Sequence, residues 1–152
     1  MASTIETIAA APSDEPQGIG GWLILPAIWL VAGLLLGVAT LFLSGALVAE
    51  MGPTGFGGLL TVLLLLQVVV IALMVQVAYH FFNKSAATPP LFIRLLIIVL
   101  CIDGFSIFLG AANGLMELTA AAARDIIVHG IHAAVFIPYF NKSVRVRNTF
   151  VN

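Results

Sequence analysis

Four long apolar runs constrain the fold of this chain more than any other feature. They cover roughly residues 23–48, 58–82, 91–113 and 119–140. A helix needs about 20 residues to cross the hydrocarbon core of a bilayer, and each run reaches that length. In lipid, a chain satisfies its backbone polar groups as a helix or as a closed barrel. The runs therefore predict an all-α fold, an integral membrane four-helix bundle.

The composition excludes a water-soluble fold and a nucleic-acid partner. Of the 152 residues, 61% are hydrophobic and 9% are charged, whereas a soluble domain usually carries about 25% charged residues. The formal net charge of -1 provides no basic field to attract nucleic acid. The single cysteine, Cys101, lies inside the third run and has no intrachain partner for a disulfide.

The segments between the runs divide the chain into three parts. Residues 1–17 are acidic and lack Lys and Arg, so they predict a disordered cytoplasmic leader rather than a signal peptide. Residues 18–143 form the four-span domain. The third connection ends in an Ala-rich stretch, a strong helix former that we assign to the fourth helix. Residues 144–152 form a basic cytoplasmic tail.

The distribution of basic residues predicts the orientation in the membrane. With four spans, both termini and the second connection lie on one side. That side holds five of the six Lys and Arg residues, and the other side holds only Arg124. The positive-inside rule therefore places both termini in the cytoplasm.

A short motif recurs at two helix ends. The second run ends in YHFFNKS (79–85) and the fourth in IPYFNKS (137–143). One interpretation is a duplicated helical hairpin, in which the bundle consists of two repeats. The other is that aromatic belts and cytoplasmic lysines favour the same residues at both ends.

The two ends of the chain resemble a known bacterial family. GIGGWLILP before the first span and YFNKSVRVRNTFV at the carboxyl end are similar to the family called domain of unknown function 2569. The resemblance covers roughly residues 18–151. It implies a small four-span protein of the bacterial inner membrane, and it implies no activity and no catalytic residues.

Asp103 lies near the middle of the third run, where an ionised aspartate costs about 2.5–3.5 kcal/mol on insertion scales. We therefore expect it to face the bundle interior. Helical spacing places further small or polar residues on the same stripe, namely Ser106, Gly110 and Asn113.

The fourth run carries a matching polar stripe of Asp125, His129 and His132. At 1.5 Å per residue, Asp103 and His129 fall at nearly the same depth. We therefore expect these two to form a hydrogen bond, and Asp125 to orient the imidazole ring. Two functions are open for the pair: a structural contact between helices, or part of a proton or ion pathway.

Several residues of the other helices are candidates for contacts. Gln76 lies on one face of the second run and Gln67 on the opposite face, so we expect one of these faces to meet another chain. Small residues allow helices to approach closely, and the candidates for such packing are Gly33, Gly37, Thr40, Ser44, Gly110 and Gly114. Candidates for anchors among lipid headgroups are Trp22, Lys142, Arg145 and Arg147.

The sequence predicts no enzyme and no cofactor. It contains no P-loop, GxSxG, HExxH or CxxC motif, and its histidines and cysteine do not form a convincing metal or haem ligand set. The leading hypothesis is an accessory or assembly partner of a larger membrane complex, in contact with membrane lipids and with another membrane protein or a second copy. The alternative is an oligomeric proton- or ion-coupled permeation unit around Asp103 and His129.

Overall fold

The computed structural model describes residues 18–52 and 54–152, so the leader expected over residues 1–17 lies outside the described residues. The predicted all-α membrane bundle is confirmed, and each end of a long helix falls within about three residues of its expected position. The elements in chain order are the 3-10 helix η1 (Gly21–Leu23), α1 (Ile24–Met51), α2 (Gly55–Phe82), α3 (Thr88–Ala112), α4 (Met116–Lys142) and the short helix α5 (Val144–Thr149).

Local chemistry explains where the long helices begin and end. Pro89 and Pro90 lie in the first turn of α3, where a missing N–H removes no helical hydrogen bond. Gly52 ends α1 and Gly114 follows α3, with φ angles of 75° and 67°, a conformation that favours glycine over other residues. The helix ends are therefore properties of short local segments.

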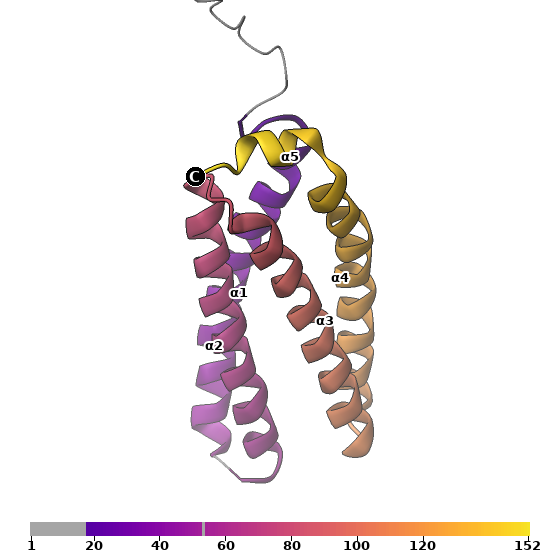
Figure 1. Ribbon diagram of the computed structural model, residues 1–152. Coiled ribbons are helices and arrows are strands. Elements are labelled where there is room, and N and C mark those ends of the chain that lie inside the picture. The colour runs from indigo at the N-terminus through magenta and orange to yellow at the C-terminus, as the bar shows by residue number, and fades with distance from the viewer. Residues whose placement is uncertain (1–17, 53) are drawn as a thin grey trace, which may run out of the picture.

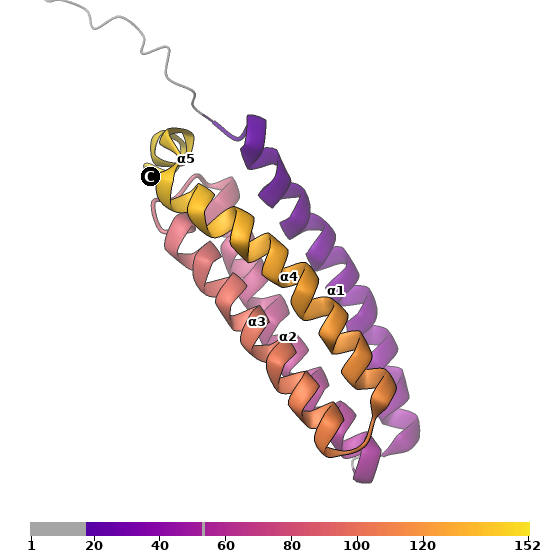
Figure 2. The same cartoon turned by 90° about the vertical axis from the view of Figure 1, so that its right-hand side faces the viewer.

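The four long helices form two hairpins that are joined at one end. Helix α1 packs along α2, α3 packs along α4, and α2 also contacts α3. In Figure 1 the hairpins lie close together below α5 and diverge toward the other end of the bundle. Figure 2 shows α5 at the end of the bundle where α1 begins.

A cluster of aromatic rings joins the hairpins at the α5 end. Phe92 of α3 stacks on Phe140 of α4, with ring centroids 4.5 Å apart. Phe150, which follows α5, contacts Phe81 of α2 at 5.3 Å. All four rings are at most 5% exposed, so this cluster is a tightly packed part of the bundle.

The carboxyl-terminal segment, which the sequence predicts only as a basic tail over residues 144–152, is folded and contains α5. We call residues 143–152 the C-terminal clasp. The hydroxyl of Ser143 accepts a hydrogen bond from the backbone N–H of Val146 and caps α5. The backbone N–H of Ala86 donates to the carbonyl of Asn152 at 2.7 Å, and the hydroxyl of Thr149 donates to the carbonyl of Gly18 at 3.2 Å. The clasp therefore ties the turn between α2 and α3 to the start of the described chain.

The recurring FNKS motif occupies two different environments. Phe82 in the first copy is 50% exposed, whereas Phe140 in the second copy is 3% exposed. Two hairpins are present, but the matching phenylalanine is exposed on the first hairpin and buried in the second. Duplication of a hairpin remains one interpretation of the motif.

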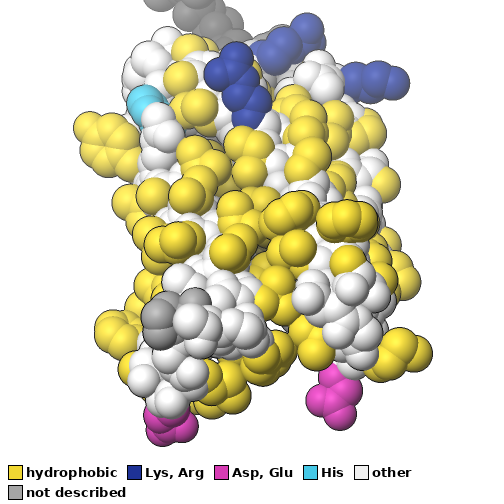
Figure 3. Space-filling view, turned by 90° about the horizontal axis from the view of Figure 1, so that it is seen from below, with side chains coloured by type: hydrophobic (Ala, Val, Ile, Leu, Met, Phe, Trp, Pro, Cys, Tyr) yellow, Lys and Arg dark blue, Asp and Glu magenta, His cyan; other side chains and the backbone are white. Residues whose placement is uncertain are grey.

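The surface of the bundle is that of a membrane protein. All four long helices are long and apolar enough to span a bilayer. Figure 3 shows hydrophobic side chains across the middle of the molecule, Lys and Arg at one end and Asp or Glu at the other. We call these the basic end, which carries α5, and the acidic end, where Glu50 and Glu117 lie.

Candidate functional site

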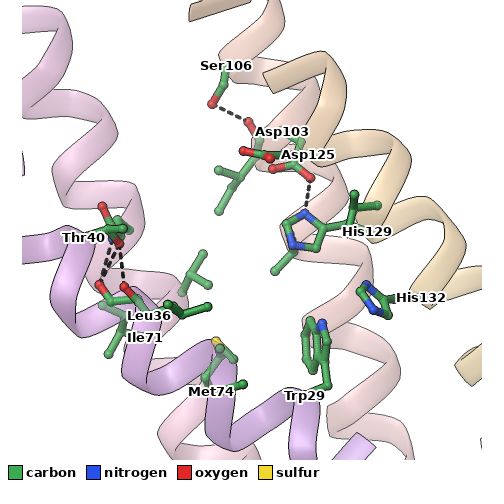
Figure 4. A pocket seen from close by; sticks show the side chains of 18 of the residues that line it. Trp29, Leu36, Thr40, Ile71, Met74, Asp103, Ser106, Asp125, His129 and His132 are labelled. Carbon is green, nitrogen blue, oxygen red and sulfur yellow. Dashed lines mark hydrogen bonds and ion pairs between the residues drawn. The ribbon is translucent and has the colours of Figure 1, made fainter. Parts of the chain in front are cut away.

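A cavity of about 630 Å³ lies between the two hairpins. All four long helices contribute to its lining, which is mostly apolar, as small-molecule sites usually are. Figure 4 shows side chains of α3 and α4 on one wall and side chains of α1 and α2 on the other. The polar residues that line it are Thr40, Gln67, Asp103, Ser106, Asp125, His129 and His132.

The central polar contact of the cavity joins Asp103 of α3 to His129 of α4. Oδ2 of Asp103 lies 2.7 Å from Nδ1 of His129, so the expected contact is present. Asp103 follows the start of α3 by 15 residues, and His129 precedes the end of α4 by 13. At 1.5 Å per residue both lie about 20 Å from the basic end. The side chains are 14% and 28% exposed, so the pair is reachable from the cavity.

Asp125 does not orient the imidazole ring, contrary to expectation. Its Oδ1 forms an ion pair with the guanidinium of Arg124 at 3.0 Å, and no hydrogen bond joins it to His129 within the described part of the chain. The prediction was wrong because the carboxylate of Asp125 bonds to the adjacent arginine instead. Asp125 nevertheless lines the cavity on the same side as Asp103.

His132 belongs to an aromatic group rather than to the polar pair. Its ring stacks on Phe136 with centroids 5.8 Å apart and lies 5.7 Å from the ring of Trp29 on α1. This group connects α1 to α4 across the cavity toward the basic end. Sequence reasoning missed Trp29, although its spacing of four residues from Gly33 places it on the small-residue face of α1.

Gln67 faces inward, which leaves the face of Gln76 as the one expected to meet another chain. Its Nε2 donates to the carbonyl of Gly37 at 2.9 Å and to the hydroxyl of Thr40. The Thr40 hydroxyl in turn donates to a carbonyl of its own helix. Gln76 is the exposed glutamine of α2, and it borders a smaller groove beside Arg94 of α3.

Three of the small-residue candidates lie at close helix contacts. A Cβ added at Gly33 would lie 2.5 Å from Cε of Met74, and one at Gly37 would lie 3.4 Å from Ile71. A Cβ at Gly110 would lie 3.1 Å from the backbone nitrogen of Thr119. These glycines therefore allow α1 to approach α2, and α3 to approach α4.

Two candidates of the third helix do not have the expected roles. Asn113 is exposed at the end of α3, where its Nδ2 donates to the carbonyl of Leu109. Gly114 lies in the turn after α3, and a Cβ there would meet nothing within 4 Å. Asn113 was expected on the interior stripe and Gly114 in helix packing, but α3 ends at Ala112, before both residues.

The remaining candidates lie at the helix faces and at the basic end. Ser44 of α1 is half-buried, and the hydroxyl of Ser106 donates to the carbonyl of Ile102 in its own helix. Trp22 is 67% exposed, while Lys142 and Arg147 are also exposed. Arg145 instead packs over Gly20 and Gly21, so it belongs partly to the closure of the clasp.

Within residues 18–52 and 54–152, no group of three or more His, Cys, Asp or Glu side chains is arranged to hold a metal ion. His129 and His132 have ring centroids 6.4 Å apart, Asp103 is bonded to His129, and Asp125 is paired with Arg124. The absence of a cofactor remains a prediction from the sequence.

The fold and the cavity together define a multi-pass integral membrane protein built on a four-helix bundle. The chain belongs to the family described as Protein of unknown function (DUF2569), whose model matches residues 16–151. The resemblance seen at the two ends of the chain is thereby confirmed. Comparisons with curated proteins and with solved structures found no match.

Proposed function

We propose that this chain is a non-enzymatic accessory or assembly partner of a larger complex in the bacterial inner membrane. The observation that carries the proposal is the exposed amide of Gln76 on the outer face of α2, beside the exposed guanidinium of Arg94. Polar groups on a lipid-facing surface are costly, and hydrogen bonds between helices are a common way to satisfy them. A partner helix docked on the α2 and α3 faces would supply those hydrogen bonds.

The polar groups of the cavity also favour a non-enzymatic role. The hydroxyls of Ser106 and Thr40 both donate to carbonyls of their own helices. Nucleophilic catalysis requires a hydroxyl or thiol within hydrogen-bond reach of a base. The described pair of Asp103 and His129 has no such nucleophile bonded to it.

Purification of the tagged native protein in a mild detergent tests this proposal. We expect a second membrane protein, or a second copy of this chain, to co-purify. Gln76→Leu should reduce the amount recovered, while Val75→Leu, at the neighbouring exposed position of α2, serves as the matched control. Recovery of a solitary monomer, or equal recovery with both variants, would contradict an interface on this face.

The second candidate function is an oligomeric proton- or ion-coupled permeation unit. The specific observation in its favour is that the hydrogen-bonded Asp103 and His129 line a cavity deep in the bundle. Intramembrane carboxylates and imidazoles commonly mark proton and ion pathways. A chain of four spans is small for a solitary transporter. Other copies of the chain would therefore supply the remaining walls of the pathway.

Flux measurements in reconstituted liposomes test the second candidate. We expect a pH gradient to drive flux that is lost with Asp103→Asn. Glu117→Gln is the control, because it removes a carboxylate at the acidic end, away from the cavity lining. Absence of flux, or the same flux in the Asp103 variant, rejects this function.

We further propose that both termini are cytoplasmic. The support is the collection of Lys84, Lys142, Arg145 and Arg147 at the basic end, which also carries the described carboxyl terminus. Positive residues are enriched on the cytoplasmic side of membrane proteins. A reporter that is active only in the periplasm should be silent when fused after Asn152, and an active reporter would invert the topology.

A further inference from the structure

The cavity wall formed by α3 and α4 carries two carboxylates, and their charge is balanced in full only when the imidazole of His129 is protonated. The carboxylates of Asp103 and Asp125 both line the cavity, whereas no Lys or Arg of the described residues lines it. Arg124 pairs with Asp125 from an exposed position. A cation is therefore favoured over an anion in this space, because charges interact strongly where water is limited.

The same wall has free hydrogen-bond acceptors. An ionised carboxylate accepts hydrogen bonds and donates none. Oδ2 of Asp103 is bonded to His129, and the other oxygen, Oδ1, has no hydrogen-bond partner among the residues that the structure describes. A ligand that donates N–H groups would satisfy this oxygen.

The opposite wall does not compete for these acceptors. Both hydrogen bonds of the Gln67 amide nitrogen go to α1, to the carbonyl of Gly37 and to the hydroxyl of Thr40. The Thr40 proton is likewise used within α1. The hydrogen-bond donors of Gln67 and Thr40 are therefore already used within the α1 and α2 hairpin.

The rest of the lining is complementary to a ligand with an apolar body. Between the polar walls, the cavity is bounded mainly by aliphatic side chains and by the ring of Trp29, which offers a face for cation–π contact. A small inorganic cation would leave most of the 630 Å³ unfilled. The aliphatic members of the lining include Leu36, Leu63, Ile71, Met74, Ile102 and Val128.

We propose that the cavity binds an amphipathic organic cation, a protonated amine that carries a compact apolar body. The ammonium group contacts Asp103 and Asp125, and the body lies among the aliphatic side chains of α1 and α2. This inference goes beyond the accessory function, because the ligand is held within a single chain and needs no partner protein. A failure to bind the cation would not contradict the accessory function, and the absence of a partner protein would not contradict cation binding.

Three compounds that share one apolar body test the proposal. They are 1-adamantylammonium, 1-adamantanol and 1-adamantanecarboxylate, and their binding is measured by calorimetry on the full chain in lipid nanodiscs, with empty nanodiscs as the blank. We expect the ammonium compound to bind about tenfold or more tightly than the alcohol, since hydrogen bonds to charged groups are the stronger ones. The carboxylate should not bind.

Two variants that should weaken binding, and one control variant, locate the site. Asp103→Asn keeps the shape of the side chain and should weaken ammonium binding about tenfold or more, while Glu117→Gln at the acidic end should leave it unchanged. Ser106→Leu should also weaken binding, because it fills the cavity beside Asp103 without removing a carboxylate. Equal binding of the three compounds, no binding of the ammonium compound, or the same affinity in Asp103→Asn would overturn the proposal.

Discussion

A double-mutant cycle on Asp103 and His129 measures how much their contact stabilises the bundle. The variants are Asp103→Leu, His129→Leu and the double substitution. Each single variant removes the hydrogen bond that joins α3 to α4 at 2.7 Å. The double variant removes both partners, so the difference between it and the sum of the single variants isolates the coupling between the two side chains.

The expected coupling free energy is modest. Hydrogen bonds between membrane helices average about 0.6 kcal/mol in such cycles, with a maximum of about 1.7 kcal/mol. The Asp103–His129 bond is short, and its side chains are only 14% and 28% exposed. We therefore expect a coupling of about 1–1.7 kcal/mol, in the upper part of that range.

Asp103→Asn is the conservative control. The amide oxygen still accepts a hydrogen bond from the imidazole N–H, so this variant should lose less stability than Asp103→Leu. Ser106→Ala provides a second control, because the Ser106 hydroxyl bonds only to its own helix and should be nearly neutral. The free energy of unfolding is measured by steric trapping in bicelles. Additive single and double variants would refute the contact as a stabilising interaction.

Two further predictions concern packing and use the same unfolding measurement. Gly110→Ala should destabilise the bundle by about 1–3 kcal/mol, because the new Cβ would lie 3.1 Å from the backbone nitrogen of Thr119. Gly104→Ala, where a Cβ meets nothing within 4 Å, should be neutral or stabilising by up to about 1 kcal/mol, and equal effects of the two would contradict the close contact. Phe150→Ala should cost about 3–5 kcal/mol because its ring is 5% exposed in the aromatic cluster. Val151→Ala, at a residue 67% exposed, should change stability by less than about 0.5 kcal/mol, and a silent Phe150 variant would show that the C-terminal clasp does not stabilise the bundle.

The sequence by itself determined the four helices, their approximate ends and the depth of the polar pair. These features are local or nearly so. A long apolar run in lipid must satisfy its backbone hydrogen bonds within itself, which makes it a helix. A constant rise per residue then places Asp103 and His129 at one level, and the cost of an intramembrane carboxylate turns Asp103 away from lipid. The hydrogen bond in the structure confirms the contact that these facts predicted.

The tertiary structure alone decided which neighbours the other polar residues meet. Gln67 faces α1 rather than another chain, and this depends on how α1 and α2 rotate against each other, which periodicity leaves open. The C-terminal clasp is held in place because the ring of Phe150 packs against Phe81 and Phe140, which lie in distant parts of the chain. The cavity exists because the hairpins are held together by those rings at the basic end and diverge beyond them. No window of sequence contains that geometry, since it arises from packing between segments that are far apart in the chain.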